Sequence, residues 1–190
     1  MRRAIADPGF KYETGAPWLD LLATVGGAYG PHPVERMRGL PQLVEWLDHQ
    51  HLTPQAPPVE ADVEATRELR ELIRPLVVAT LADEPVPAAA VAALQPWLDD
   101  GTAPRPVVVD GRIVLAAPPT ARAALGGLAR QAVEFLADPG HIRLGACADE
   151  DCHMAFLDPA GKRRWCVSGV CGVRARVRKH RARTVQGDDA

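Results

Sequence analysis

The sequence lacks the features that would place the protein in a membrane or export it. Its longest uninterrupted apolar run is far short of the roughly 20 residues that span a bilayer. Met1-Arg2-Arg3 is followed by Ala, Ile, Ala, Asp, Pro and Gly rather than by an apolar segment, so no signal peptide is expected. We therefore expect no membrane association and a cytoplasmic location, where cysteines stay reduced or bind metal.

Catalytic motifs are also missing. The chain contains no Gly-rich phosphate loop, no HExxH and no GxSxG sequence. His49 and His51 lie close to Asp48, a combination that acid–base catalysis can use, but a polar helix end accounts for it more simply. The sequence predicts a protein that is not an enzyme.

Net charge is nearly absent, but the charge is unevenly distributed. The 190 residues include 22 Lys+Arg and 24 Asp+Glu, which gives a formal charge of -2. Residues 1–146 hold 13 basic and 18 acidic residues, a net charge of -5. All nine remaining basic residues lie within 161–183, where no acidic residue occurs. This segregation indicates a surface that binds a polyanion.

Apolar residues recur at helical spacing along most of residues 17–140, with Pro and Gly between the segments. We expect helices over 17–28, from near 41, from near 59, over 87–98, and from Thr120 to Pro139-Gly140. The second helix is expected to bury Leu43, Val44 and Leu47. We expect a kink or a break at Pro75 in the third, and an interruption at Pro96 in the fourth.

One segment predicts strands instead of a helix. Two β-branched runs, 107–109 and 113–115, flank Asp110-Gly111, which is a strong hairpin pattern. The overall expectation is a mainly α fold with a short β-hairpin over residues 1–140. A second unit, residues 141–190, contains all four cysteines and most of the dense charge.

The cysteines predict a metal site. Cys147, Cys152, Cys166 and Cys171 are spaced C-x4-C-x13-C-x4-C, and two close pairs joined by a longer loop are typical of tetrahedral zinc. Two disulfides or four unrelated thiols are the alternatives, and His141 or His153 could replace one cysteine as a ligand. We expect one structural Zn²⁺, because a closed site of four cysteines leaves no open position for a substrate.

The residues after Cys171 predict a basic helix. Val173, Val177 and His180 fall on one stripe, which we expect to pack on the metal-binding segment that contains the four cysteines. The remaining faces of the helix are basic, so their side chains repel one another. Binding to the phosphates of a nucleic acid would relieve this repulsion. The residues expected to bind DNA are Lys162, Arg163, Arg164, Arg174, Arg176, Arg178, Lys179, Arg181 and Arg183. A solvated charged tail is the alternative, since the chain has 19 Arg against 3 Lys throughout.

Residues 141–183 closely resemble the CGNR zinc finger of bacterial proteins. The resemblance rests on the cysteine spacing, on Phe156-Leu157-Asp158, on Arg163-Arg164-Trp165-Cys166 and on the basic helix after Cys171-Gly172. It implies four cysteine zinc ligands, a treble-clef-like finger that ends in the basic helix, and DNA binding. The Asn of the family's name is Val173 here.

The preceding region is similar to the ABATE domain, which accompanies this finger in proposed stress-induced transcription regulators. The similar stretches are Trp18-Leu19-Asp20-Leu21-Leu22-Ala23-Thr24-Val25, Leu43-Val44-Glu45-Trp46-Leu47 and Arg67-Glu68-Leu69-Arg70. The resemblance implies a regulator of transcription that responds to a ligand or forms a homodimer. Trp18, Asp20 and Thr24 are candidates to line an effector pocket, although a capping or surface role is the alternative. A zinc-stabilised module that binds protein or RNA is the alternative function.

Overall fold

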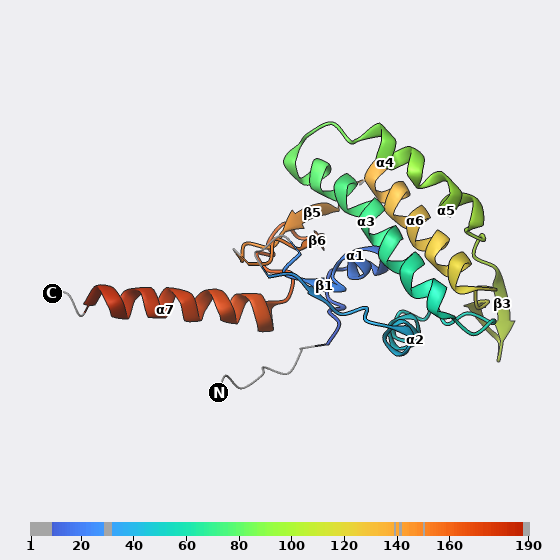
Figure 1. Cartoon of the computed structure of the whole chain (residues 1–190), viewed down its shortest axis with the longest axis horizontal. Helices are drawn as coiled ribbons and strands as arrows, with labels where there is room; N and C mark the ends of the chain where they lie inside the picture. The colour runs from blue at the N-terminus through green and yellow to red at the C-terminus, as the bar shows by residue number, and fades with distance from the viewer. Residues whose placement is uncertain (1–8, 29–31, 139, 141, 150, 188–190) are drawn as a thin grey trace.

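The computed structural model describes residues 9–28, 32–138, 140, 142–149 and 151–187, and the last six of these by their backbone alone. A helical body is followed by a finger of two strands, and a terminal helix projects away from both (Figure 1). The helices of the body are α1 (Pro17–Leu22), α2 (Leu40–His49), α3 (Glu60–Ala82), α4 (Ala88–Ala93), α5 (Gln95–Asp100) and α6 (Ala121–Ala137).

Three antiparallel strand pairs accompany the helices. They are β1 (Val25–Gly26) with β2 (Val34–Glu35), β3 (Pro106–Val109) with β4 (Arg112–Leu115), and β5 (Arg143–Ala146) with β6 (Ala155–Asp158). A π-helical turn, η1 (Ser168–Gly172), leads into the terminal helix α7 (Val173–Gly187). This is the mainly α architecture with a short hairpin that the sequence predicts.

The core of the body lies where α1, α3, α5 and α6 meet (Figure 1). Trp18, Trp46 and Trp97 are each at most 2% exposed within it. The helix α6 and the end of α5 approach so closely that a Cβ on Gly126 would lie 2.5 Å from the Trp97 carbonyl oxygen. Glycine is therefore required at position 126.

The same hydrophobic cluster continues into the finger. Phe156 and the four cysteines are buried together with the leucines of α1. The beginning of the described chain also reaches the finger, because the Leu157 amide donates to the Thr14 carbonyl oxygen at 2.7 Å. The finger therefore packs on the body instead of standing apart from it.

The first helix is shorter than expected and ends at Leu22 rather than near Ala28. Val25 leaves the helix to pair with Glu35. The Thr24 hydroxyl donates to the Leu21 carbonyl oxygen at 2.7 Å, which satisfies an acceptor at the end of the helix. Pairing with a strand distant in sequence has outweighed the local helical pattern.

The third helix is continuous, so of the kink or break expected at Pro75 the break is wrong. A proline inside a helix costs about 3 kcal/mol. Ile73, Leu76 and Val77 are buried on both sides of it, and this packing holds the helix together. The interruption expected at Pro96 lies instead at Leu94, since Pro96 occupies the first turn of α5, where its missing N–H is not needed.

In the second helix the sequence misidentified one core position. Leu43 and Leu47 are buried as expected, but Val44 is 45% exposed. Trp46 is fully buried in its place. The Trp46 side chain is larger than that of Val44, so the helix places the face of Trp46 in the core and leaves Val44 exposed.

The expected hairpin and helix cap are both present. In the hairpin Val108 pairs with Ile113, and Asp110 and Gly111 have φ of 49° and 72°, the left-handed values that such a two-residue turn requires. At the start of α6 the Ala123 amide donates to the Thr120 hydroxyl at 3.1 Å. Each of the eight strand residues of this hairpin is exposed.

Candidate metal centre and basic helix

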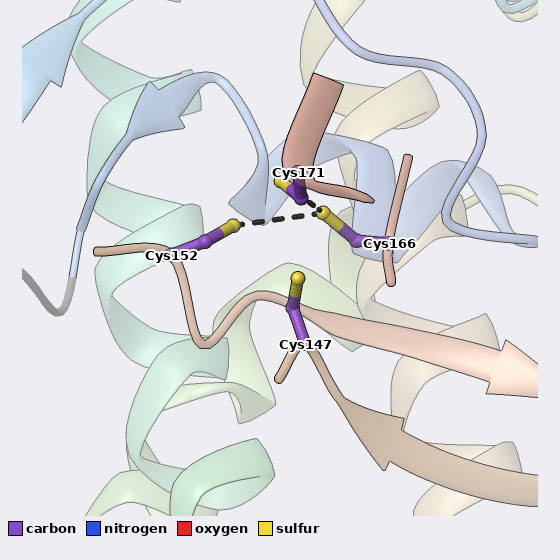
Figure 2. Close-up of side chains that lie close together, drawn as sticks. All are labelled: Cys147, Cys152, Cys166 and Cys171. Carbon is purple, nitrogen blue, oxygen red and sulfur yellow. Dashed lines mark hydrogen bonds between the residues drawn. The ribbon is translucent and has the colours of Figure 1, made fainter. Parts of the chain in front are cut away.

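The four cysteines converge on one point (Figure 2). Cys147 follows β5, Cys152 precedes β6, Cys166 lies in the loop after β6, and Cys171 belongs to η1. Their sulfur atoms all lie within 4.8 Å of one another. Each cysteine is at most 1% exposed.

The sulfur geometry suits a tetrahedral metal ion. The Cys152 and Cys166 sulfurs are 3.5 Å apart, and those of Cys166 and Cys171 are 3.6 Å apart. Four thiolates at about 2.3 Å from a zinc ion would be about 3.8 Å from one another. A disulfide would need about 2.05 Å. All four cysteines are free, so the structure favours the metal site over two disulfides.

Backbone hydrogen bonds form the turn that carries the first pair of cysteines. The Cys147 amide donates to the Met154 carbonyl at 2.9 Å, and the Cys152 amide donates to the Asp149 carbonyl at 2.8 Å. The Ala148 amide donates to the Arg164 carbonyl at 2.9 Å, which joins this turn to the loop of Cys166. The two halves of the site are thus held together by the backbone.

The crowded thiols cannot all ionise without a cation. Hydrogen bonds from Cys152, Cys166 and Cys171 lower the pKa of Cys147. Hydrogen bonds with Cys147, Cys152 and Cys171, together with burial, raise the pKa of Cys166. A metal ion at the centre would remove this conflict, because it stabilises all four thiolates at once.

A buried carboxylate connects the metal centre to the terminal helix. Asp149, in the turn between Cys147 and Cys152, is fully buried. Arg178 contacts Asp149 through Nη2 and Asp151 through Nη1, the latter at 2.9 Å. The Arg174 Nε lies 2.9 Å from the Asp149 Oδ2, within ion-pair range but without the alignment of a hydrogen bond. These contacts attach the first turns of α7 to the finger.

Arg174 also touches the site itself. Its Nη2 lies 3.5 Å from the Cys171 sulfur. Burial alone would lower the pKa of Arg174, but the Cys171 contact and the charge of Asp149 raise it. A cation at this position would offset part of the excess negative charge of a metal bound to four thiolates.

Arg163 is also used inside the finger. Its amide donates to Asp158 at 2.9 Å, and its guanidinium donates to the carbonyls of Leu157, Cys166 and Glu13 at 3.0, 2.6 and 2.8 Å. The guanidinium carbon also lies 4.6 Å from the centre of the Phe156 ring. Arg163 therefore joins the loop of Cys166 to the start of the chain.

Six of the residues expected to bind DNA remain, and five of them have exposed side chains. Among the described residues, no ion pair involves the exposed side chains of Lys162, Arg164, Arg176, Lys179 and Arg181. The side chain of Arg183 lies outside the part of the chain that the structure describes. The structure thus separates basic residues that hold the finger from basic residues that face solvent.

The apolar stripe of α7 does not pack on the finger, contrary to expectation. Val173 and Val177 are 42% and 43% exposed. Arg174 and Arg178 face the finger instead, because Asp149 is buried there and requires a positive partner. The acidic residues between the first two cysteines, opposite a basic helix, were the sequence feature that could have revealed this contact.

The three candidate effector residues lie in the core of the body. Trp18 is 2% exposed and its ring centre lies 5.5 Å from that of Phe135. Asp20 accepts hydrogen bonds from the Thr14 hydroxyl at 2.7 Å and from the Gln50 side chain at 3.0 Å. The Thr24 hydroxyl accepts a hydrogen bond from Arg70 at 2.9 Å. No local pattern in the sequence indicates these partners.

Comparison with known families matches both parts of the chain. Residues 15–139 match the ABATE family model, whose description is "Putative stress-induced transcription regulator". Residues 143–184 match the CGNR zinc finger. Neither description names an enzyme. No curated protein matches the chain. In the part of the chain that the structure describes, no helix is long and apolar enough to cross a membrane.

Proposed function

The chain belongs to the ABATE family and carries a CGNR zinc finger, and from this premise we propose that it is a DNA-binding regulator of transcription. The observation that carries the proposal is the division of basic residues in the finger. Arg174 and Arg178 hold α7 against Asp149, while Arg176 and Lys179 remain in solvent.

We propose one structural Zn²⁺ held by Cys147, Cys152, Cys166 and Cys171. The four sulfurs lie close to the spacing that tetrahedral zinc requires, and the site is closed by protein on all sides because each cysteine is buried. The ion would fix the turn after β5 and the start of α7 relative to each other. A cytoplasmic location is part of the proposal, since reducing conditions keep the four thiols available for the metal.

The terminal helix offers one face to DNA. It projects away from the body (Figure 1). At 3.6 residues per turn, Arg176 lies about 160° around the helix from both Arg174 and Arg178, and Lys179 follows Arg176 on the same side. The face opposite the Asp149 contact is therefore basic. Lys162 and Arg164, on the loop before Cys166, would add backbone contacts.

Salt-dependent retention on DNA tests this proposal. We expect the zinc-loaded protein to bind DNA with an affinity that falls steeply with salt. The double variant Arg176→Gln/Lys179→Gln should lower the slope of log affinity against log salt by about 2, because about one counterion is released per phosphate contact. The matched control is Arg112→Gln, which removes an exposed arginine from the hairpin at the far end of the body (Figure 1).

The alternative is a zinc-stabilised module that binds an acidic protein or RNA. The same basic face would serve that function. Retention on RNA at a salt concentration where DNA is lost would favour RNA. Absence of DNA binding by the zinc-loaded protein at low salt would overturn the regulator proposal.

The body of the protein would provide the regulation. We propose a homodimer that forms through the β3–β4 hairpin, whose exposed side chains include Val108 at 74%, Ile113 at 78% and Leu115 at 66%. Because Val108 pairs with Ile113 and alternate residues of a strand share a face, Val108, Ile113 and Leu115 lie on one face of the hairpin, and a contiguous exposed apolar patch marks an interaction site. Both strands also have a free edge among the described residues. Light scattering of Val108→Thr/Ile113→Thr tests the proposal, because a dimer formed there should dissociate.

A further inference from the structure

A cavity of about 730 Å³ lies beside the base of the hairpin, on the side that faces α6 and the loop after α2. Its volume falls within the range of pockets that hold small molecules. Leu52, Val107 and Leu115 provide apolar walls from three separate segments. None of Trp18, Asp20 and Thr24 lines it.

The middle of α6 leaves this cavity open. Gly127 lines the cavity, and a Cβ placed on it would meet no atom within 4 Å. Its neighbour Gly126 is required by the close approach of α5, but no such contact explains Gly127. Glycine in a helix interior is unfavourable relative to alanine. Gly127 therefore leaves space at the cavity that a longer side chain would fill.

Two polar side chains at the cavity, Arg105 and Gln131, can donate hydrogen bonds to an anion. Arg105 lines one wall, and Gln131 lies one turn after Gly127 on the same face of α6. Both side chains are exposed, and within the described ranges no hydrogen bond or ion pair occupies either of them. The acidic side chain of the lining, Asp48, accepts a hydrogen bond from the Thr53 hydroxyl at 3.3 Å. A guanidinium can bind a carboxylate through two parallel hydrogen bonds.

From the open helix face, the apolar walls and the positive group at the rim, we infer that this cavity binds a small organic acid. The apolar part of the ligand would lie over Gly127 and against Leu52, Val107 and Leu115. Its carboxylate would face Arg105, with Gln131 as a further donor. The inference deepens the proposed regulatory function, because it assigns an effector site and the chemical class of the effector.

The test uses the full zinc-loaded chain and two probes of equal shape, 2-naphthoate and the uncharged 2-naphthamide. Calorimetric titration should show naphthoate bound about tenfold or more tightly than naphthamide, because a hydrogen-bonded charge pair contributes that much. Arg105→Gln should remove this difference. Val91→Thr, which alters an exposed side chain of α4 outside the cavity, should leave both affinities unchanged.

Two substitutions at one position separate the cavity from other surfaces. Gly127→Ala should bind naphthoate within about twofold of the wild type, since it adds one methyl group, whereas Gly127→Leu should weaken binding about tenfold or more. Gln131→Trp provides a second blocking variant if Gly127→Leu unfolds. Equal binding by the wild type and both blocking variants, or equal affinity for the two probes, would overturn the inference.

Failure of this inference is distinguishable from failure of the proposed function. Binding of the probes is measured without DNA, and retention on DNA is measured without the probes. Naphthoate binding by a protein that never binds DNA would leave the acid site intact and remove the transcriptional role. DNA binding by a protein that does not bind naphthoate would support the transcriptional role and overturn the acid site.

Discussion

Arg178 bridges two carboxylates, the fully buried one of Asp149 and the exposed one of Asp151. Both acids belong to the turn that carries the first two cysteines, whereas Arg178 lies in the second turn of α7. The direction in which the helix leaves the finger therefore depends on Arg178, together with Arg174, as well as on the metal site. Arg178 is therefore engaged within the protein, unlike the exposed Arg176 and Lys179.

Asp149→Asn should destabilise the zinc-loaded protein far more than Asp151→Asn. Loss of the buried partner leaves Arg174 and Arg178 without their main counter-charge, and we expect a loss of about 2 kcal/mol in the free energy of unfolding. Asp151 is about half exposed, so its removal should cost less than about 1 kcal/mol. Denaturant unfolding measures both. Equal effects of the two substitutions would contradict the role assigned to Asp149.

Cys166→Ser should abolish stoichiometric zinc binding. The wild type should contain one zinc per chain by metal analysis, and the variant should lose it because a tetrahedral site needs its fourth thiolate. The expected effect extends beyond the finger, since the cysteines share a hydrophobic cluster with α1. Chelation of the metal should therefore lower the thermal midpoint of the helical body, followed by tryptophan fluorescence. An unchanged body transition would show that the two parts fold independently.

Gly126→Ala and Gly127→Ala should have opposite effects on stability. A methyl group at 126 would collide with the Trp97 carbonyl, which is backbone and cannot move aside cheaply, so we expect a loss of about 2 kcal/mol or more. A methyl group at 127 meets open space and improves helix propensity, so we expect a gain of about 0.5–1 kcal/mol. Thermal unfolding of the two variants gives the comparison. A destabilised Gly127→Ala would show that position 127 has a packing constraint.

Acid should weaken the ion pair between Glu35 and Arg70. Burial alone would raise the pKa of Glu35, but the hydrogen bond and charge of Arg70 outweigh it and hold the pKa below its usual value. The folded state thus favours the charged form. Its contribution to stability is present above the usual glutamate pKa of about 4.3 and is lost as the pH falls through the lower folded value.

The variant Glu35→Gln tests whether the contribution of Glu35 to stability is lost as the pH falls. The variant should be less stable than the wild type by about 1 kcal/mol at pH 7, a figure reduced for the partial exposure of Glu35. The difference should shrink below about pH 4.3. Comparing variant and wild type at each pH cancels the acid sensitivity of the metal site. The exposed Glu84→Gln is the control, and a difference that grows at low pH would contradict the assignment.

Local patterns predicted much of the fold. Apolar residues at helical spacing located the helices of the body, because most of them bury a single face. The Asp110-Gly111 turn and the Thr120 cap were also predicted, since each depends on interactions only a few residues apart. The cysteine spacing likewise predicted the convergence of four sulfurs.

Features that depend on distant partners were not predicted. The first helix ends early because Val25 pairs with Glu35, ten residues away. The valine stripe of α7 lies in solvent because Asp149 attracts two arginines to the finger. In both cases the local sequence pattern fits the expected structure as well as the observed one. The observed structure depends on a partner distant in sequence, which is Glu35 for Val25 and Asp149 for the arginines of α7.

The contact between the Leu157 amide and the Thr14 carbonyl has a consequence for the order of folding. Because these residues stand at opposite ends of the chain, β6 can pair with the Thr14 segment only after nearly the whole protein has been synthesised. Arg163 makes a second contact of this kind, because its guanidinium donates a hydrogen bond to the Glu13 carbonyl. The finger is thus completed late and from both ends of the polypeptide, so a chain cut short at either end would have an incomplete finger.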